Sequence, residues 1–184
     1  MEPAVIVLDG GSSSGTSSVA RCLQSLLAST WLALGVDDLV RALPGGAEPV
    51  GAQPSIDYGA DGSVTLGEDF RRAEAAWYAG LAAMVRSGTG LVVDEVFLGG
   101  RSSQDRLAAA FAGLAVTWVG VRCAGEVAAA REAQCPDRVS GMAQQQAERV
   151  HVGVRYDFVV DTTVASAAEC AETIVVWLSA RPLG

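Results

Sequence analysis

The 184-residue chain contains no lysine, so its thirteen basic residues are all arginine, and it has a single histidine, His151. With one histidine, a Ser-His-Asp or Cys-His mechanism has little material, and we expect His151 to be a surface residue at a helix end. The four cysteines form no Cys-x-x-Cys pair, which argues against a structural zinc site. Cys22, Cys123 and Cys170 lie among apolar residues and are predicted to be core residues, whereas Cys135 lies in a polar stretch and is expected to be exposed.

Long hydrophobic runs and an excess of positive charge are also missing. No apolar stretch reaches the roughly 18–20 residues that cross a bilayer, and residues 1–9 lack the basic segment of a signal peptide. The net charge of −8 disfavours nucleic acids and anionic membranes as partners, because both reward basic surfaces. We therefore expect one cytoplasmic domain over residues 1–184 that acts on a small molecule; the sequence leaves a homo-oligomer open.

What the chain does contain is a strand, a glycine loop and a helix at its start. An apolar run at residues 4–8 predicts a buried strand, and residues 19–27 have the pattern of an amphipathic helix. The residues between them fit the phosphate-loop template G-x-x-x-x-G-K-[ST] at every fixed position except that of the lysine, which is Thr16. The candidate nucleotide-binding residues of this loop are Gly10, Gly11, Ser12, Ser13, Ser14, Gly15, Thr16 and Ser17.

The chemistry of this loop can be separated into what remains and what is missing. Glycines let successive backbone N–H groups turn inward and bind an anion, and the Ser17 hydroxyl is the expected ligand of Mg²⁺. Loss of one transition-state donor, here the lysine, typically costs about 3–4 kcal/mol, a rate factor on the order of 10²–10³. The alternative is a Gly/Ser turn without a ligand, but the flanking strand and helix favour phosphate binding.

Apolar runs alternate with helical patterns along the rest of the chain. Strands are expected at residues 31–36, 91–93, 116–121 and 158–160, and helical segments at 39–43, 68–87, 102–113, 125–133, 140–151 and 166–179. Residues 44–66 form an excursion with a hairpin of 55–58 and 63–66. This alternation predicts an α/β fold, a parallel sheet with helices on both faces, and a ligand site at the carboxyl ends of its strands.

Three aspartates follow predicted strands and are expected to meet the glycine loop at that edge. Asp37 is a candidate base that accepts a proton from a substrate hydroxyl; capping of the turn at 39–43 is an equally good explanation of its position. Asp94 resembles a carboxylate that holds Mg²⁺, and Glu95 is an alternative residue for that function. A surface acid at the end of a strand is the alternative explanation of Asp94. Asp161 is the third.

Arginines are candidates for the missing positive charge. Arg131 and Arg138 flank a polar segment between two helices, about 131–140, where a mobile lid would bring guanidinium groups to the phosphates. A solvated helix face is the alternative. Arg101, close to the Asp94 strand end, is a further candidate for the lysine's charge.

Aromatic side chains are candidates for an acceptor pocket above Asp37. They are Trp31, Tyr58, Phe70, Trp77 and Phe97. Aromatic residues at such spacing more often belong to the core, so we expect at least half of them to be only that.

Six stretches together resemble the chloramphenicol phosphotransferases of antibiotic-producing actinomycetes. They are Gly10–Ser13, Arg21–Ser25, Gly35–Asp37, Asp94–Gly100, Trp118–Cys123 and Val160–Thr163. The resemblance implies a P-loop kinase-like fold, a five-stranded parallel sheet with a short lid, and phosphorylation of a hydroxyl group with ATP and Mg²⁺. By position, Asp37 matches the family's base, Arg131 and Arg138 its lid, and Asp161, Thr162 and Thr163 a loop near the nucleotide base.

Three positions depart from the family pattern. Thr16 replaces the lysine, Cys135 stands where another lid arginine is expected, and Arg101 replaces a small residue. One hypothesis is an ATP- or GTP-dependent O-phosphotransferase acting on an antibiotic or a natural-product intermediate. The alternative is a repurposed relative that has lost phosphoryl transfer and binds or converts a secondary-metabolism intermediate in the former acceptor pocket. A non-catalytic nucleotide binder is a third reading.

Overall fold

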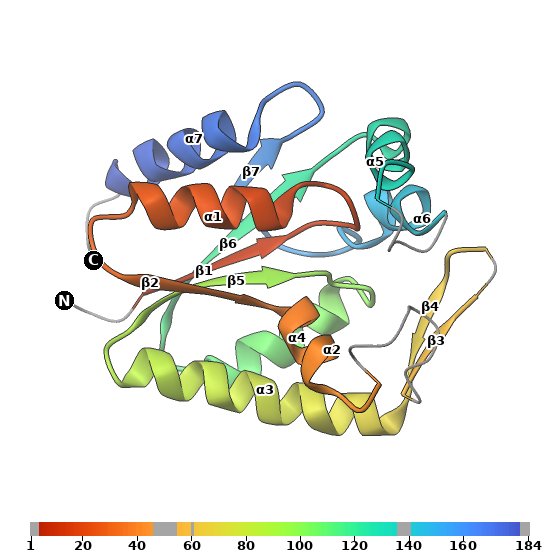
Figure 1. Ribbon diagram of the computed structural model, residues 1–184. Coiled ribbons are helices and arrows are strands. Elements are labelled where there is room, and N and C mark those ends of the chain that lie inside the picture. The colour runs from red at the N-terminus through yellow and green to blue at the C-terminus, as the bar shows by residue number, and fades with distance from the viewer. Residues whose placement is uncertain (1–3, 46–54, 60, 136–140, 181–184) are drawn as a thin grey trace.

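A five-stranded parallel sheet with the order β2-β5-β1-β6-β7 lies at the centre of the computed structural model, which describes residues 4–45, 55–59, 61–135 and 141–180 (Figure 1). The strands are β1 (Ala4–Asp9), β2 (Trp31–Gly35), β5 (Gly90–Glu95), β6 (Ala115–Arg122) and β7 (Phe158–Asp161). Because all pairs are parallel, every strand delivers its last residue to the same edge. The fold class predicted from the sequence, α/β with a five-stranded parallel sheet, is confirmed.

Helices cover both faces of this sheet. In Figure 1, α1 (Thr16–Leu26) and α7 (Ala167–Ser179) lie along the upper face, and α3 (Glu68–Arg86) and α4 (Arg101–Ala110) along the lower face. The remaining elements gather beyond the carboxyl edge. They are α2 (Val36–Ala42), α5 (Gly125–Glu132), α6 (Met142–Arg149) and the predicted hairpin, formed by β3 (Ile56–Tyr58) and β4 (Val64–Leu66). Short elements therefore cover this edge, whereas longer helices cover the two faces of the sheet.

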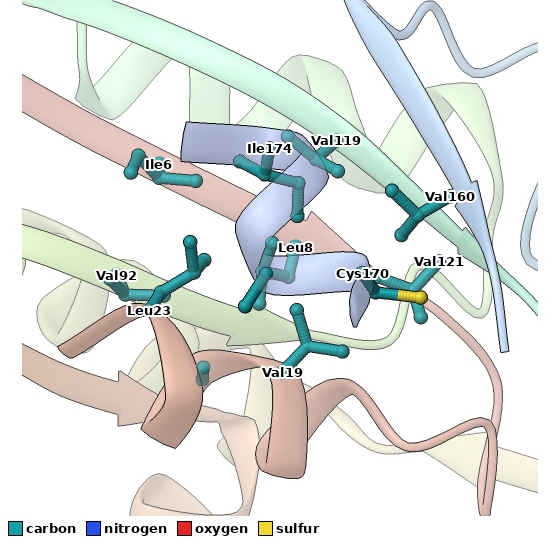
Figure 2. Close-up of a cluster of buried hydrophobic side chains, with 12 residues drawn as sticks. Ile6, Leu8, Val19, Leu23, Val92, Val119, Val121, Val160, Cys170 and Ile174 are labelled. Atoms are coloured by element: carbon teal, nitrogen blue, oxygen red, sulfur yellow. The ribbon is translucent and has the colours of Figure 1, made fainter. Parts of the chain in front are cut away.

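The position of β1 at the centre of the sheet explains why its sequence is continuously apolar. Side chains alternate between the two faces of a strand. Ile6 and Leu8 point into the cluster formed with α1 and α7, which Figure 2 shows, while Val5 and Val7 belong to the cluster formed with α3 and α4. All four side chains are at most 2% exposed, so β1 fixes the start of the glycine loop that follows it.

Element boundaries differ from the sequence-based ones in two informative places. Helix α1 begins at Thr16, three residues earlier than predicted, because Gly15 takes the left-handed conformation with φ 93° and ends the loop there. The turn expected at 39–43 is the end of a helix that starts at Val36. The cysteine predictions hold for Cys123 and Cys170, which are buried, and for Cys135, which is exposed.

Parts of two predicted features fall outside the described residues: positions 46–54 and 60 of the hairpin excursion, and positions 136–140 of the lid, Arg138 among them. Among the helices that the structure describes, none has the length and apolar character that crossing a bilayer requires.

The core beneath α7 gives a stability prediction. Ile174 is fully buried in the cluster of Figure 2, whereas Val176 on the same helix is 69% exposed. We expect Ile174→Ala to lower the free energy of unfolding by about 2–5 kcal/mol, because it leaves a cavity between α7 and the sheet. The matched Val176→Ala control should change it by less than about 0.5 kcal/mol in urea denaturation. Equal effects of the two substitutions would contradict the packing described here.

Candidate active site

The loop between β1 and α1 is shaped as an anion-binding nest. Ser13 and Gly15 both have positive φ, 60° and 93°, and such alternation of backbone handedness turns successive N–H groups to one side. The backbone N–H groups of Ser13, Gly15, Thr16 and Ser17 have no acceptor among the residues that the structure describes. They lie at the N-terminus of α1, where the helix dipole adds positive potential. These features suit a bound phosphate chain.

Two side chains from distant parts of the sequence hold this loop. Gln146 on α6 accepts a hydrogen bond from the Ser12 N–H at 2.8 Å through its Oε1 atom. Thr162, just beyond β7, donates its hydroxyl to the Ser14 carbonyl oxygen at 2.5 Å. Among the described residues, Ser12 is the one residue of the loop whose N–H donates to a side chain, so the described side chains leave the other N–H groups of the cradle open.

Ser17 and Asp94 form the second part of the site. The Ser17 hydroxyl donates to Asp94 Oδ2 at 2.5 Å, which joins the first turn of α1 to the carboxyl end of β5. Burial raises the pKa of Asp94, hydrogen bonds from Ser17 and Thr16 oppose that rise, and the charges of Asp37 and Asp38 add to it. The nearby negative charges and hard oxygen donors suit Mg²⁺, which binds proteins through one or two carboxylates and completes its shell with phosphate and water.

No group of three His, Cys, Asp or Glu side chains with metal-ligand geometry occurs among the described residues. The Ser17–Asp94 pair therefore fits a metal that arrives with a phosphate ligand better than a resident metal.

Arg131 is the cation that the structure fixes beside the loop. Its Nη2 donates to the Thr162 carbonyl oxygen at 2.7 Å, and its Nη1 lies 3.4 Å from both Thr162 Oγ1 and Cys123 Sγ. A Cβ added to Gly15 would lie 3.9 Å from the same Nη1. Arg131, near the end of α5, thus borders the nest.

A cavity of about 720 Å³ opens in front of the loop. Its lining comes from the hairpin, one side of α3, helix α2 and the carboxyl end of β5 as well as from the loop. Side chains that line it include Asp37, Ile56, Tyr58, Val64, Leu66, Phe70, Arg71, Glu74, Tyr78, Asp94, Glu95 and Arg131. The site therefore places phosphate-binding groups on one side and an acceptor-sized space on the other.

Asp37 faces this cavity and takes no part in capping α2. The cap is made by Asp38, whose Oδ2 accepts the Gly35 N–H at 2.9 Å and whose Oδ1 pairs with Arg41 at 2.8 Å. Burial, and then the charge of Asp37, raise the pKa of the Tyr58 hydroxyl, which lies on the hairpin across from α2. The capping explanation for Asp37 is thus replaced by a position in the cavity wall.

Three of the proposed aromatic side chains do not reach the cavity lining. Trp31 begins β2, about 13 Å from the strand's end at Gly35 on strand geometry, and borders a separate shallow hollow. Phe97 is fully buried and its ring centroid lies 6.2 Å from that of Trp118. Trp77 packs between two hydrophobic clusters. Tyr58 and Phe70 do line the cavity, in keeping with the expectation that at least half are core.

Other candidates are also placed elsewhere. Arg101 opens α4, where its Nε donates to Asp105 at 2.7 Å, and it does not line the cavity. Asp161 is exposed and its Oδ1 accepts the Thr163 N–H at 2.7 Å, while Thr163 Oγ1 accepts the Ala124 N–H at 2.8 Å. Of Asp161, Thr162 and Thr163, it is Thr162 that contacts the glycine loop. Arg138 lies outside the described residues.

A buried polar group beneath the loop was missed by the sequence reasoning. Asp9, the last residue of β1, accepts hydrogen bonds from the Phe97 N–H at 2.8 Å and from the Tyr156 hydroxyl, which lies 2.6 Å from His151 Nδ1. The prediction that His151 is a surface residue is wrong: it is 7% exposed, and burial lowers its pKa to about 4. An acid placed directly before the glycine loop was the available signal for Asp9.

Glu95 and Glu74 are two more buried acids of the cavity that the sequence did not single out as a pair. Glu95 is 2% exposed, and its Oε1 has no hydrogen-bond partner among the described residues. Burial, followed by the charges of Glu74, Asp94 and Asp9, raises the pKa of Glu95 well above its usual value. The floor of the cavity therefore carries a carboxyl group that favours its neutral form.

Comparisons with known proteins agree with this geometry. A family model described as chloramphenicol phosphotransferase-like protein matches residues 3–179. Two proteins from strains of Mycobacterium tuberculosis, named "Putative O-phosphotransferase MT2714" and "Putative O-phosphotransferase Rv2636", are each 30% identical over 188 residues. The match covers 94% of this chain and 81% of each relative.

Solved structures of kinases share the fold. A sugar kinase from Janibacter sp. HTCC2649 superposes with a TM-score of 0.68 at 17% identity, covering 99% of this chain and 97% of that one. A gluconokinase from Sinorhizobium meliloti 1021 gives 0.65 at 23% identity, with coverage of 97% and 93%. Shikimate kinase from Acinetobacter baumannii in complex with shikimate gives 0.61 at 14%, with 98% and 95%. The predicted P-loop kinase-like fold is confirmed.

The buried Asp9 makes stability depend on pH. Burial raises its pKa from 3.8 to about 7, so between about pH 4 and pH 7 the native state holds a proton that the unfolded chain releases. Asp9 therefore contributes a fall in the free energy of unfolding as pH rises through this window, while His151, whose pKa burial lowers from 6.5 to about 4, contributes a rise between about pH 4 and pH 6.5. We expect Asp9→Asn to remove up to about 4 kcal/mol of the falling contribution, measured as the difference from the wild-type protein by urea denaturation across the window.

The exposed Asp105→Asn variant is the control and should keep the pH dependence of the wild-type protein. Buried Asp94 and Glu95 have shifts of the same sign as Asp9, and His151 has one of the opposite sign, so the free energy of unfolding of Asp9→Asn should fall less, or rise more, with pH than that of the wild-type protein. An unchanged pH dependence in Asp9→Asn would contradict the described environment of Asp9.

Proposed function

This chain belongs to the chloramphenicol phosphotransferase-like family and is a phosphotransferase, and we propose that it uses ATP to phosphorylate a hydroxyl group of a small molecule. The observation that carries the proposal is the nest of N–H groups at Ser13 and Gly15–Ser17, which have no acceptor among the described residues and share one cavity with Asp37. Phosphate groups and an acceptor hydroxyl have places on opposite sides of that space. The acceptor class we propose is an antibiotic or a natural-product intermediate.

The loop binds and orients the phosphates in this proposal. Its N–H groups are already turned inward by Ser13 and Gly15, so little reorganisation is needed when the phosphates bind. Ser17 and Asp94 would hold Mg²⁺ together with phosphate oxygens. When bound, such an ion offsets negative charge on the phosphates and helps to orient them.

Asp37 acts as the general base. Its carboxylate accepts the proton of the acceptor hydroxyl while the hydroxyl oxygen forms a bond to the terminal phosphorus and the bond from that phosphorus to ADP breaks. Its position in the cavity wall, with Asp38 performing the helix cap, leaves its carboxylate available for this role.

Arg131 supplies the charge that lysine gives in the common form of the loop. Thr162 anchors one side of its guanidinium group, and the group borders Gly15. Arginine offers five N–H donors in a planar fork, so an anchored guanidinium can still donate to a phosphate. We propose the same function for Arg138, whose place in the chain is seven residues further along.

The absence of the lysine favours a second candidate function. A relative that has lost phosphoryl transfer would keep the cavity and bind or convert a natural-product intermediate there, without consuming ATP. ADP release that depends on an acceptor supports the phosphotransferase, and its absence supports the second function.

The base assignment gives a kinetic prediction. Asp37→Asn should lower kcat by about 10²–10⁴, because the amide cannot accept the hydroxyl proton, and should leave ATP binding nearly unchanged. The neighbouring Asp38→Asn is the control: it weakens the cap of α2, which costs about 1 kcal/mol of stability, but should retain most activity. Coupled detection of ADP release measures both. Full activity in Asp37→Asn would overturn the assignment.

The role of Arg131 can be tested with a rescue. Arg131→Gln should lower kcat/KM for ATP by about 10²–10³, because it removes a donor beside the phosphates. Adding Thr16→Lys to that variant should recover much of the loss, since it restores positive charge at the usual position of the loop. Thermal unfolding verifies that both variants fold. A wild-type rate in Arg131→Gln, or a double variant as slow as the single one, would contradict the proposal that Arg131 supplies the charge of the missing lysine.

A further inference from the structure

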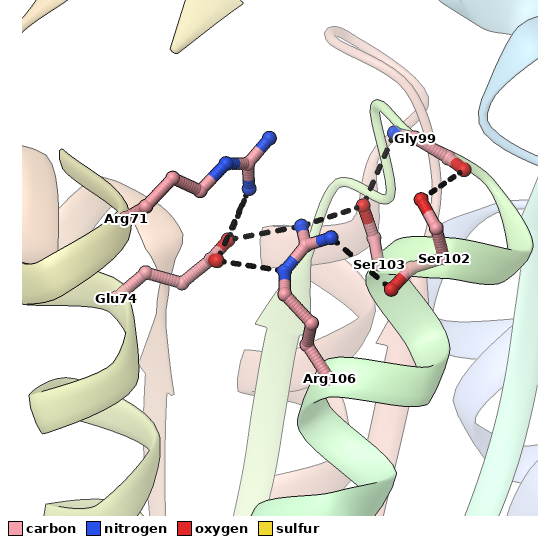
Figure 3. Close-up of polar contacts among 6 residues, drawn as sticks. All are labelled: Arg71, Glu74, Gly99, Ser102, Ser103 and Arg106. Carbon is pink, nitrogen blue, oxygen red and sulfur yellow. Dashed lines mark hydrogen bonds and ion pairs between the residues drawn. The ribbon is translucent and has the colours of Figure 1, made fainter. Parts of the chain in front are cut away.

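Besides Arg131, the cavity is lined by Arg21, Arg41 and Arg71, and Arg71 is the one on the same helix as the apolar side chain of Phe70. Arg71, on α3, lines the cavity together with Phe70, Glu74 and Tyr78, which all lie on one side of that helix. Figure 3 shows that Arg71 meets Glu74 through one nitrogen: Nη1 lies 2.9 Å and 3.1 Å from the two carboxylate oxygens. Its Nε and Nη2 have no partner among the residues that the structure describes, and the side chain is 38% exposed. One edge of the guanidinium fork is therefore available.

Glu74 does not need Arg71 to balance its charge. Its carboxylate, buried to 8% exposure, also accepts hydrogen bonds from Arg106 on α4, with Nε at 2.9 Å and Nη2 at 3.5 Å. Two guanidinium groups thus share one carboxylate, which leaves a net positive charge in the group. Since Arg106 points its donors at Glu74, Ser102 and Ser103, the uncompensated charge is presented to the cavity by Arg71.

The cluster is also rigid. Arg106 donates to the Ser102 carbonyl oxygen and to Ser103 Oγ, each at 3.1 Å, and Ser103 Oγ accepts the Gly99 N–H at 3.1 Å (Figure 3). Glu74 is held by these contacts at a fixed place, and it holds Arg71 in turn. A guanidinium group that is oriented before a ligand arrives loses little entropy on binding, and its free edge matches the two oxygens of a carboxylate.

Apolar side chains surround this charge. Ile56 of β3 and Phe70 of α3 belong to one hydrophobic cluster, and Val64 and Leu66 of β4 line the cavity with them. A ligand that used both features would have an apolar body and an anionic end.

We propose that the acceptor is a hydroxylated carboxylic acid whose carboxylate binds the free edge of Arg71 while its hydroxyl group lies at Asp37. This inference rests on the proposed function, because it names the acceptor class of the same site. It adds a specificity-determining residue that lies apart from the phosphate-binding loop. Arg72, the next residue, is exposed and pairs with Asp69, so it provides a matched control.

Calorimetric binding without nucleotide tests the inference directly. The probes are shikimate and para-hydroxymethylbenzoate, each paired with its neutral methyl ester. We expect the wild-type protein to bind each acid about ten-fold or more tightly than its ester, as one charge-assisted pair warrants. Arg71→Gln should abolish this preference and Arg71→Lys should keep part of it, while Arg72→Gln should retain the wild-type preference.

Several results would overturn the inference: equal affinity of the wild-type protein for acid and ester, no detectable binding of either acid, or a preference that survives in Arg71→Gln. A loss in Arg71→Gln that is the same for acid and ester would place Arg71 on another part of the ligand and would also overturn it. Thermal unfolding should show that Arg71→Gln folds, because Arg106 still pairs with Glu74.

ADP release with the same compounds is measured separately from binding. Acid binding that depends on Arg71 without any ADP release would contradict the proposed function and leave the acceptor inference standing. ADP release with neutral acceptors only would contradict the acceptor inference and leave the proposed function standing.

Discussion

One residue, Thr162, connects the two halves of the phosphate site. It donates to the Ser14 carbonyl oxygen and so helps to hold the loop in its nest conformation, and the carbonyl oxygen of the same residue anchors Arg131. The shape of the anion cradle and the position of its nearest fixed cation are therefore set by one residue beyond β7. Gln146 adds a second support from α6. The loop is pre-organised by the carboxyl-terminal third of the chain, and its own glycines only permit that shape.

This dependence explains which parts of the site the sequence could predict. The strand, loop and helix at the start of the chain, and the acids that follow β2 and β5, came from local patterns of apolar and polar residues. The contacts of Gln146 and Tyr156 could not, because they join positions more than 130 residues apart and only the folded sheet brings these together.

The aromatic residues show a different limit. Aromatic residues such as Trp31 and Phe97 are common in pocket walls, but the fold places these two elsewhere. Trp31 stands at the amino end of β2, and Phe97 is fully buried in the core cluster formed with α3 and α4. Apolar spacing did predict helix α3, yet no local pattern showed that Phe70, Glu74 and Tyr78 would line the cavity.

The geometry of arginine explains how the site can do without lysine. An ammonium group is a point charge, whereas a guanidinium group can donate hydrogen bonds to the protein from one edge and to a ligand from another. Arg131 is anchored by Thr162 and borders the loop, and Arg71 is anchored by Glu74 and borders the acceptor space. Both guanidinium groups line the cavity that also contains Asp94 and Glu95, and each is held by a different residue of the protein.

The central claim is that the loop binds a nucleotide without its lysine. Isothermal titration calorimetry with ATP, in the presence and absence of Mg²⁺, tests it most directly. The account predicts saturable binding of one ATP per chain, strengthened by Mg²⁺ because Ser17 and Asp94 help to hold the ion. Saturation with a small hydroxy acid but no measurable binding of ATP under either condition would contradict it.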